Sequence, residues 1–203
     1  MRIITLYPGS WGSNCYLLIN GNHAAVVDPS PKAEQILNVL QQENARLEYI
    51  LLTHGHFDHT VSLDTLRQIA HVPAMIHEQD AELPSDSVKN GFRVFFHMDQ
   101  TYRTPDRCLQ SDEVIMLGDQ KIRVVHTPGH TAGSVCFLCN NEFLLTGDTL
   151  FDGGRGRTDL YSGNETQLFL TLDSLRSLPQ DIPIYPGHGT PSTLGHALDS
   201  VIY

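Results

Sequence analysis

Long apolar runs are missing from this chain of 203 residues. No stretch approaches the roughly 20 consecutive apolar residues that a helix needs to cross a bilayer. The first twenty residues carry Arg2 as their one positive charge, and they contain no long apolar stretch followed by a small-residue cleavage site. The sequence therefore predicts a cytoplasmic protein that is neither secreted nor associated with a membrane.

Positive charge is also scarce. The chain has 13 Lys and Arg residues against 23 Asp and Glu residues, a formal net charge of −10 at neutral pH. This excess of negative charge disfavours nucleic acids and anionic membranes as partners. A small molecule remains the expected partner, and it can be anionic because the local field around a site can oppose the net charge of the protein.

Cysteine is limited to positions 15, 108, 136 and 139. Cys136 and Cys139 are close in sequence, but they lie in the apolar segment SVCFLC and no second pair at metal-site spacing accompanies them. The sequence therefore predicts reduced thiols in the core in preference to a zinc or redox site.

Histidine, by contrast, is abundant, with 11 residues that cluster beside carboxylates. The segment LLTHGHFDHT places His54, His56, Asp58 and His59 within six positions. Alternate residues of an extended chain point the same way, so His54 and His56 can bind one metal ion. Asp58 and His59 lie where the chain turns into a helix and can reach a second ion. Four such side chains without a cation would be electrostatically unfavourable, so we expect a metal centre here.

Three further segments share one design, a strand that ends in a polar turn flanked by glycine. They are VVHTPGHTAGS with His130, LLTGDTLF with Asp148, and IYPGHGTP with His188. Strand ends hold ligands rigidly, and glycine lets the backbone turn tightly. Five imidazoles and two carboxylates suffice for two adjacent metal sites of four or five ligands each. We assign His54, His56 and His130 to the first ion, Asp58, His59 and His188 to the second, and Asp148 as the bridge.

Hydrophobic patterning predicts strands followed by a helix in each half of the chain. The expected strands are Arg2–Leu6, Asn14–Ile19, Ala24–Asp28, Tyr49–Thr53, Val114–Met116, Lys121–His126, Ser134–Leu138, Glu142–Thr146 and Ile182–Tyr185. Helices are expected after Ser30, read as a capping residue before Pro31, over Val61–Ala70, and around Leu168, Leu172 and Leu175. This order favours two sheets packed face to face with helices outside. The aromatic stretch between Pro84 and Cys108 is interpreted as a packed connection in preference to a lid.

The metal-binding segments occur in an order that resembles a known family. HGHFDH, HTPGHTAGS, TGDTLF and PGHG, together with VVDPS near the start, resemble the motifs of metallo-β-lactamase-fold hydrolases, and within them the single-domain glyoxalase II-like group. The resemblance covers nearly the whole chain. It implies an α+β fold, a four-layer αββα sandwich of two mixed sheets with outer helices, formed by one domain over residues 1–203. It also implies two divalent metal ions at one edge of the sheets, with zinc expected and iron or manganese as alternatives.

The resemblance also implies roles for individual residues. Asp58 and Asp148 would act in catalysis together with a metal-bound hydroxide. Asp28 resembles the acidic residue that supports the metal ligands from behind. GGRGRTDL resembles the glycine-rich loop that presents a basic residue to the thiol part of the substrate, so Arg157 is the candidate for binding a substrate carboxylate. Tyr161 is a further candidate for substrate binding. Trp11 is expected to flank the site.

The implied reaction is hydrolysis of an acyl thioester, such as S-lactoylglutathione, by metal-activated water. Glyoxalase II proper has an additional C-terminal helical domain, so the short chain is closer to single-domain bacterial relatives, and the expected substrate is an anionic thioester. The main alternative is an Fe(II)-dependent persulfide dioxygenase with one iron held by His54, His130 and Asp148. A lactonase, a β-lactamase or another ester hydrolase, and a metal-binding protein without catalysis, are further alternatives.

Overall fold

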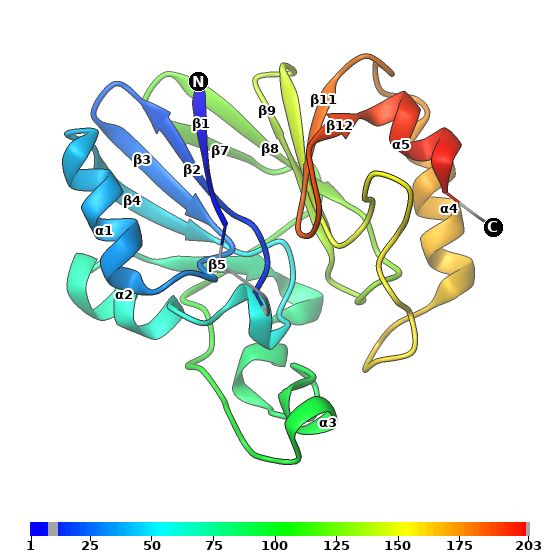
Figure 1. Cartoon of the computed structure of the whole chain (residues 1–203), viewed down its shortest axis with the longest axis horizontal. Helices are drawn as coiled ribbons and strands as arrows, with labels where there is room; N and C mark the ends of the chain where they lie inside the picture. The colour runs from blue at the N-terminus through cyan, green and yellow to red at the C-terminus, as the bar shows by residue number, and fades with distance from the viewer. Residues whose placement is uncertain (8–11, 202–203) are drawn as a thin grey trace.

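The computed structural model describes residues 1–7 and 12–201. It has two six-stranded sheets that pack face to face, and helices cover the outer surface of each sheet (Figure 1). The predicted αββα sandwich is therefore confirmed. None of the helices in the described ranges has the length and apolar character required to cross a membrane.

The first sheet comes from the N-terminal half of the chain. Its strands lie in sequence order: β1 (Arg2–Leu6), β2 (Cys15–Asn20), β3 (His23–Val27), β4 (Arg46–Leu51), β5 (Ala74–His77) and β6 (Arg107–Leu109). The first three strands are antiparallel, and β3 to β6 run parallel. Helices α1 (Ala33–Gln42) and α2 (Leu63–Ala70) provide two of the crossovers between parallel strands and cover the outer face (Figure 1).

The second sheet comes from the C-terminal half. In the order β12-β11-β10-β9-β8-β7 it contains β7 (Val114–Leu117), β8 (Gln120–His126), β9 (Val135–Cys139), β10 (Phe143–Gly147), β11 (Pro183–Pro186) and β12 (Ser192–Thr193). The β10–β11 pair is parallel and the other pairs are antiparallel. Helices α4 (Glu165–Leu175) and α5 (Leu194–Ser200) cover its outer face, whereas α3 (Phe92–Phe96) lies apart from both sheets (Figure 1).

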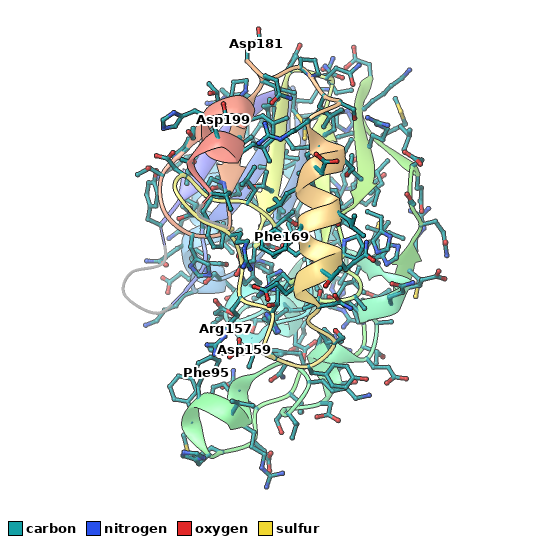
Figure 2. All side chains as sticks on the ribbon, turned by 90° about the vertical axis from the view of Figure 1, so that its right-hand side faces the viewer. Phe95, Arg157, Asp159, Phe169, Asp181 and Asp199 are labelled. Carbon is teal, nitrogen blue, oxygen red and sulfur yellow. The ribbon has the colours of Figure 1, made fainter. Side chains whose placement is uncertain are left out.

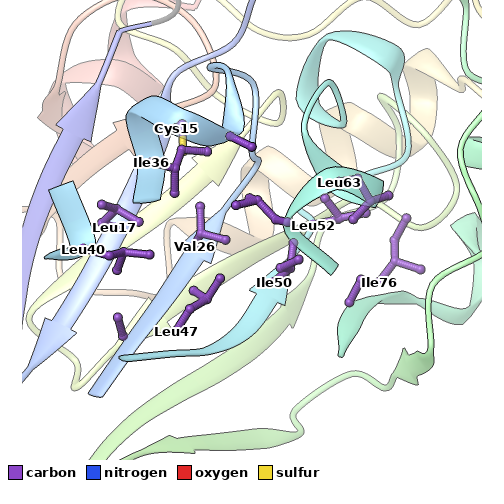
Figure 3. Packing of buried hydrophobic residues seen from close by; sticks show 14 of the residues in the cluster. Cys15, Leu17, Val26, Ile36, Leu40, Leu47, Ile50, Leu52, Leu63 and Ile76 are labelled. Carbon is purple, nitrogen blue, oxygen red and sulfur yellow. The ribbon is translucent and has the colours of Figure 1, made fainter. Parts of the chain in front are cut away.

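Strand β2 contributes side chains to two hydrophobic cores, one on each face of the first sheet. Leu17 faces the helices, where it packs with Ile36 of α1 and Val26 of β3 (Figure 3). Tyr16 and Leu18 face the second sheet and belong to the inter-sheet core. Both faces of the strand are buried, so its sequence is continuously apolar instead of alternating.

Several predicted boundaries are corrected by the structure. Helix α1 begins at Ala33, not at Pro31, and the residue before it, Lys32, makes no side-chain cap. Residues 28–31 are instead held in a loop in which Ser30 N donates to Asp28 O at 2.7 Å. Strand β4 ends at Leu51 because Thr53, which was predicted to lie in the strand, donates from its backbone and its hydroxyl to Asp28.

The sequence patterns missed some short elements, namely β5, β6, β12, α3 and α5. The interpretation of the stretch from Pro84 to Cys108 as a packed connection holds for Tyr102, which is buried against the first core. It is wrong for Phe95 and Phe96, which are exposed. Cys136 and Cys139 are free and buried, as predicted, and burial raises the pKa of the Cys136 thiol to about 11. Cys15 is free and buried as well.

Candidate metal centre

The seven predicted metal ligands meet at one edge of the sandwich. His54 and His56 follow β4, and Asp58 and His59 lie in the short 3-10 helix η1 (Phe57–His59). His130 follows β8, Asp148 follows β10, and His188 follows β11. Each side chain therefore stands just beyond the carboxyl end of a strand, where a rigid sheet fixes its position.

Three histidines form the first group. His130 Nε2 lies 3.2 Å from His54 Nε2 and 2.9 Å from His56 Nδ1, and all three side chains are buried. Nitrogens bound to one zinc ion at 2.0–2.1 Å in tetrahedral geometry are about 3.3 Å apart. The spacing in this group is close to that value.

The second group contains a carboxylate and two histidines. Asp58 Oδ2 lies 3.2 Å from His188 Nε2 and 3.7 Å from His59 Nε2. Asp148 stands between the two groups, because its Oδ1 is 3.3 Å from His59 Nε2 and its Oδ2 is 3.6 Å from His130 Nε2. This position is compatible with the predicted bridge.

The protonation states of His54, His56 and Asp148 suit a metal. Burial and the neighbouring imidazoles lower the pKa of His54 well below its usual value, and burial lowers the pKa of His56 to about 3. Burial works to raise the pKa of Asp148, but the positive charge of His59 outweighs it and the pKa is lowered. Neutral imidazoles and ionised carboxylates are the forms that bind metal ions. Burial works to lower the pKa of His59, but the surrounding carboxylates outweigh it and raise that pKa well above its usual value, so a bound cation would displace the His59 proton.

A direct test of fit comes from buried polar atoms. Within residues 1–7 and 12–201, four buried side-chain atoms have no hydrogen-bond partner, and three of them belong to candidate ligands: His56 Nε2, His59 Nε2 and Asp148 Oδ1. Unpaired buried polar atoms are costly and rare. Two of them, His59 Nε2 and Asp148 Oδ1, lie 3.3 Å apart in a set of imidazole and carboxylate donors, an arrangement that fits a divalent cation. His56 faces the first group through Nδ1, so its unpaired Nε2 lies on the other side of the ring.

Asp28 makes a hydrogen bond to His59, on the side of the imidazole that faces away from Asp58 and Asp148. It is buried and takes a left-handed backbone conformation, with φ of 52°. Its Oδ2 accepts a hydrogen bond from His59 Nδ1 at 2.9 Å, which leaves His59 Nε2 directed at Asp58 and Asp148. A carboxylate–histidine contact of this kind fixes the tautomer of an imidazole that binds a metal ion, which is the role that the resemblance predicts for Asp28.

A second buried carboxylate, Asp80, was not found from the sequence. It accepts hydrogen bonds from Gly55 N at 3.2 Å, Thr131 Oγ1 at 2.6 Å and Gly133 N at 2.7 Å. It thereby joins the turn that carries His54 and His56 to the turn that carries His130. The surrounding segment, HEQDAEL, is rich in acidic residues and has the pattern of a solvated surface, so nothing in it distinguishes Asp80.

We expect Asp80→Asn to weaken metal binding about 10- to 100-fold. The amide would direct a donor at groups that are themselves donors, and the two turns would lose their common anchor. Zinc affinity, measured by competition with a chromophoric chelator, checks this. Glu78→Gln, an exposed change in the same segment, is the control. An unchanged affinity for Asp80→Asn would show that the turns hold their ligands without it.

A cavity of about 380 Å³ opens above the candidate ligands. Arg157 lies in its lining, and Arg157 O accepts a hydrogen bond from His130 Nδ1 at 2.7 Å. Tyr161, the other residue predicted to bind substrate, is exposed and lies under Lys89 Nζ, 5.1 Å from its ring centre. Trp11 falls outside the described residues.

Comparison with known proteins connects this arrangement to a family. The family model of the metallo-beta-lactamase superfamily matches residues 8–188. The probable metallo-hydrolase YqgX of Bacillus subtilis (strain 168) is 31% identical over 179 residues, covering 87% of this chain and 85% of that protein. The hydroxyacylglutathione hydrolase GloC of Haemophilus influenzae (strain ATCC 51907 / DSM 11121 / KW20 / Rd) is 32% identical over 199 residues, covering 96% and 94%.

Solved structures of metallo-beta-lactamases and related proteins are also similar to this chain. The B3 metallo-beta-lactamase BLEG-1 has a TM-score of 0.91 at 31% identity, covering 98% of this chain and 97% of that one. TTHA1623 in a di-iron-bound form has a TM-score of 0.82 at 31% identity, covering 97% and 96%. ETHE1 from Myxococcus xanthus has a TM-score of 0.77 at 25% identity, covering 96% and 80%.

Proposed function

The chain belongs to the metallo-β-lactamase superfamily of hydrolases, and on that premise we propose that it hydrolyses acyl thioesters with two divalent cations, zinc being the expected metal. The observation that carries the proposal is the set of seven donors, five of which line the cavity, with Asp148 between the two groups. The similarity to GloC, a hydroxyacylglutathione hydrolase, over 94% of its length supports the thioester as substrate.

Three of the candidate ligands have tasks in this reaction beyond holding the cations. When bound, the two cations supply Lewis acidity, which lowers the pKa of water and polarises a carbonyl group. Asp58 and Asp148 line the cavity, and their carboxylates are placed to orient the attacking water and to take its proton. The hydrogen bond from His130 Nδ1 to Arg157 O keeps His130 Nε2 directed at the reacting centre.

The chemistry balances without a protein nucleophile. The oxygen of water bonds to the thioester carbonyl carbon, the carbon–sulfur bond breaks, and a carboxylic acid and a thiol are released. A thiolate is a good leaving group, so a strong general acid is not required. The substrate is proposed to be a small anionic thioester, and S-lactoylglutathione is the first to test.

The test is kcat/KM for S-lactoylglutathione with enzyme loaded separately with zinc, manganese and ferrous iron. We expect a value above about 10⁴ M⁻¹s⁻¹ in at least one metal form, within the usual range for an enzyme with its substrate. A penicillin serves as counter-substrate, because BLEG-1 is a B3 metallo-beta-lactamase. Trace rates with the thioester in every metal form, alongside two bound ions, would overturn the proposal.

A second candidate is an Fe(II)-dependent persulfide dioxygenase. The observation that favours it is a cluster of two histidines and one carboxylate, because His130 Nε2 lies 3.2 Å from His54 Nε2 and 3.6 Å from Asp148 Oδ2. Two histidines and a carboxylate suit Fe(II) with open positions. One iron per chain and oxygen consumption with glutathione persulfide would favour this function over hydrolysis.

A further inference from the structure

The wall of the cavity above the candidate ligands is apolar. Phe57 and Phe151 come from the segments that carry Asp58 and Asp148, and Leu160 comes from the loop that follows β10. Phe95 and Phe96 reach the cavity from α3. The rings of Phe95 and Phe96 lie 5.9 Å and 5.6 Å from that of Phe57, so these three side chains form one continuous surface.

The polar side chains on this wall already have partners. Apart from the candidate ligands, the described lining contains two, Asn90 and Arg157. The Asn90 amide donates to Gln100 O at 2.9 Å and to Pro84 O at 3.4 Å, and its oxygen accepts from Phe92 N at 2.9 Å. Asn90 therefore holds the α3 segment in place and has little capacity left for a substrate.

Arg157 is held in the same way. Its Nε and one terminal nitrogen donate to the two oxygens of Asp159 at 2.6 Å and 2.7 Å, and its guanidinium lies 5.3 Å from the ring centre of Phe95. Figure 2 shows the three side chains together, with Phe95 on α3 and the ion pair on the neighbouring loop. The pair is bidentate, and its side chains are 48% and 66% exposed, so solvent weakens it. A substrate carboxylate would have to compete with Asp159 for the guanidinium.

We propose that the acyl group taken by this cavity is uncharged and apolar, an aromatic or branched aliphatic group, and that Asp159 sets this specificity by neutralising Arg157. The inference rests on the proposed thioester hydrolysis and names the substrate class for it. The cavity of about 380 Å³ lies within the range of small-molecule sites. Aromatic rings favour an apolar group, whereas a charged group would lose its hydration against them without a partner.

The experiment compares three thioesters of one thiol. S-mandeloylglutathione differs from S-lactoylglutathione by a phenyl group in place of a methyl group, and S-succinylglutathione carries a carboxylate in its acyl chain. We expect kcat/KM to be at least about tenfold higher for the mandeloyl than for the lactoyl thioester, as is usual for extra apolar groups in an apolar pocket. The succinyl thioester should be the poorest of the three.

Two variants test the residues themselves. Phe95→Ala should remove most of the preference for the mandeloyl thioester, and Val94→Ala, an equally exposed change on the same helix away from the cavity, should keep it. Asp159→Asn should raise kcat/KM for the succinyl thioester about tenfold by releasing Arg157.

A binding measurement separates this inference from the proposed function. Calorimetry with two thioethers that cannot be hydrolysed, S-(2-phenylethyl)glutathione and S-(2-carboxyethyl)glutathione, should give tighter binding of the phenyl compound. Equal affinities, or tighter binding of the carboxylate, would overturn the inference whether or not thioesters are cleaved. If the phenyl compound bound more tightly but no thioester were hydrolysed, the proposed function would be overturned. The conclusion that the cavity prefers an apolar group would be retained.

Discussion

Asp148→Asn is expected to lower kcat/KM by at least about a thousandfold, the scale on which charge-stabilising groups act in active sites, and to reduce the bound metal below two ions per chain. The residue is largely enclosed by His59, His130 and His188. Its Oδ1 faces His59 of the second group, and its Oδ2 lies near both His130 of the first group and His188 of the second. An amide keeps the shape of the side chain, but it loses the negative charge and replaces one acceptor by a donor. Both groups of candidate metal ligands would then lose the negatively charged ligand that they share.

Elemental analysis of metal per chain, measured together with kcat/KM, checks this result. Asp152→Asn is the matched control, because Asp152 lies four residues further along and is partly exposed, with Ser192 and His196 as partners. The control should bind two ions and retain its activity. If Asp148→Asn kept both ions and normal turnover, Asp148 would not be the bridge.

Gly187→Ala should lower kcat/KM by about a hundredfold or more, although the change adds a single methyl group. A Cβ at this position would lie 2.1 Å from Asp148 Oδ1 and 2.8 Å from His59 Cε1, closer than real Cβ atoms approach other atoms. Gly187 N also donates to Gly147 O at 2.8 Å, which limits how far the loop can move. Asp148 would therefore be displaced, and displacements of about 1 Å at a reacting centre cost about a hundredfold in rate.

Steady-state kinetics and zinc affinity measure this effect, and circular dichroism checks that the fold is kept. Gly154→Ala is the control, since a Cβ there would meet Phe151 at 3.9 Å, an ordinary contact. We expect normal kinetics for the control. Normal zinc affinity and turnover in Gly187→Ala would mean that Asp148 and His188 tolerate a shift, and that the tight placement of the bridge is unnecessary.

The candidate ligands could be found from the sequence because metal chemistry leaves a local signature. His54 and His56 alternate along an extended chain, Asp58 and His59 follow at once, and each remaining donor has a neighbouring glycine in the turn that follows a strand. Asp80 could not be found in this way. Its three donors, Gly55, Thr131 and Gly133, lie 25 to 53 positions away along the chain, and its own segment resembles a solvated surface.

The position of the Asp148 side chain likewise depends on tertiary contacts that the sequence pattern does not contain. The register between β10 and β11 shifts between Leu145 and Gly147, and such an irregularity redirects the side chains that follow it. Gly147 takes a φ of 48° at this point, and a Cβ there would lie 2.5 Å from Thr53 Oγ1. An alternation pattern read along β10 contains no information about this shift.

The sequence by itself determined which side chains can bind metal, that they stand at strand ends, and that two sheets with outer helices carry them. These features depend on neighbours in the chain, whose relative directions follow from the repeat of a strand or helix. The tertiary structure alone decided that Asp80 joins two metal-binding turns, that Asp159 neutralises Arg157, and that α3 brings Phe95 to the cavity. Those contacts depend on loop conformation, strand register and the meeting of distant segments, which no local pattern encodes.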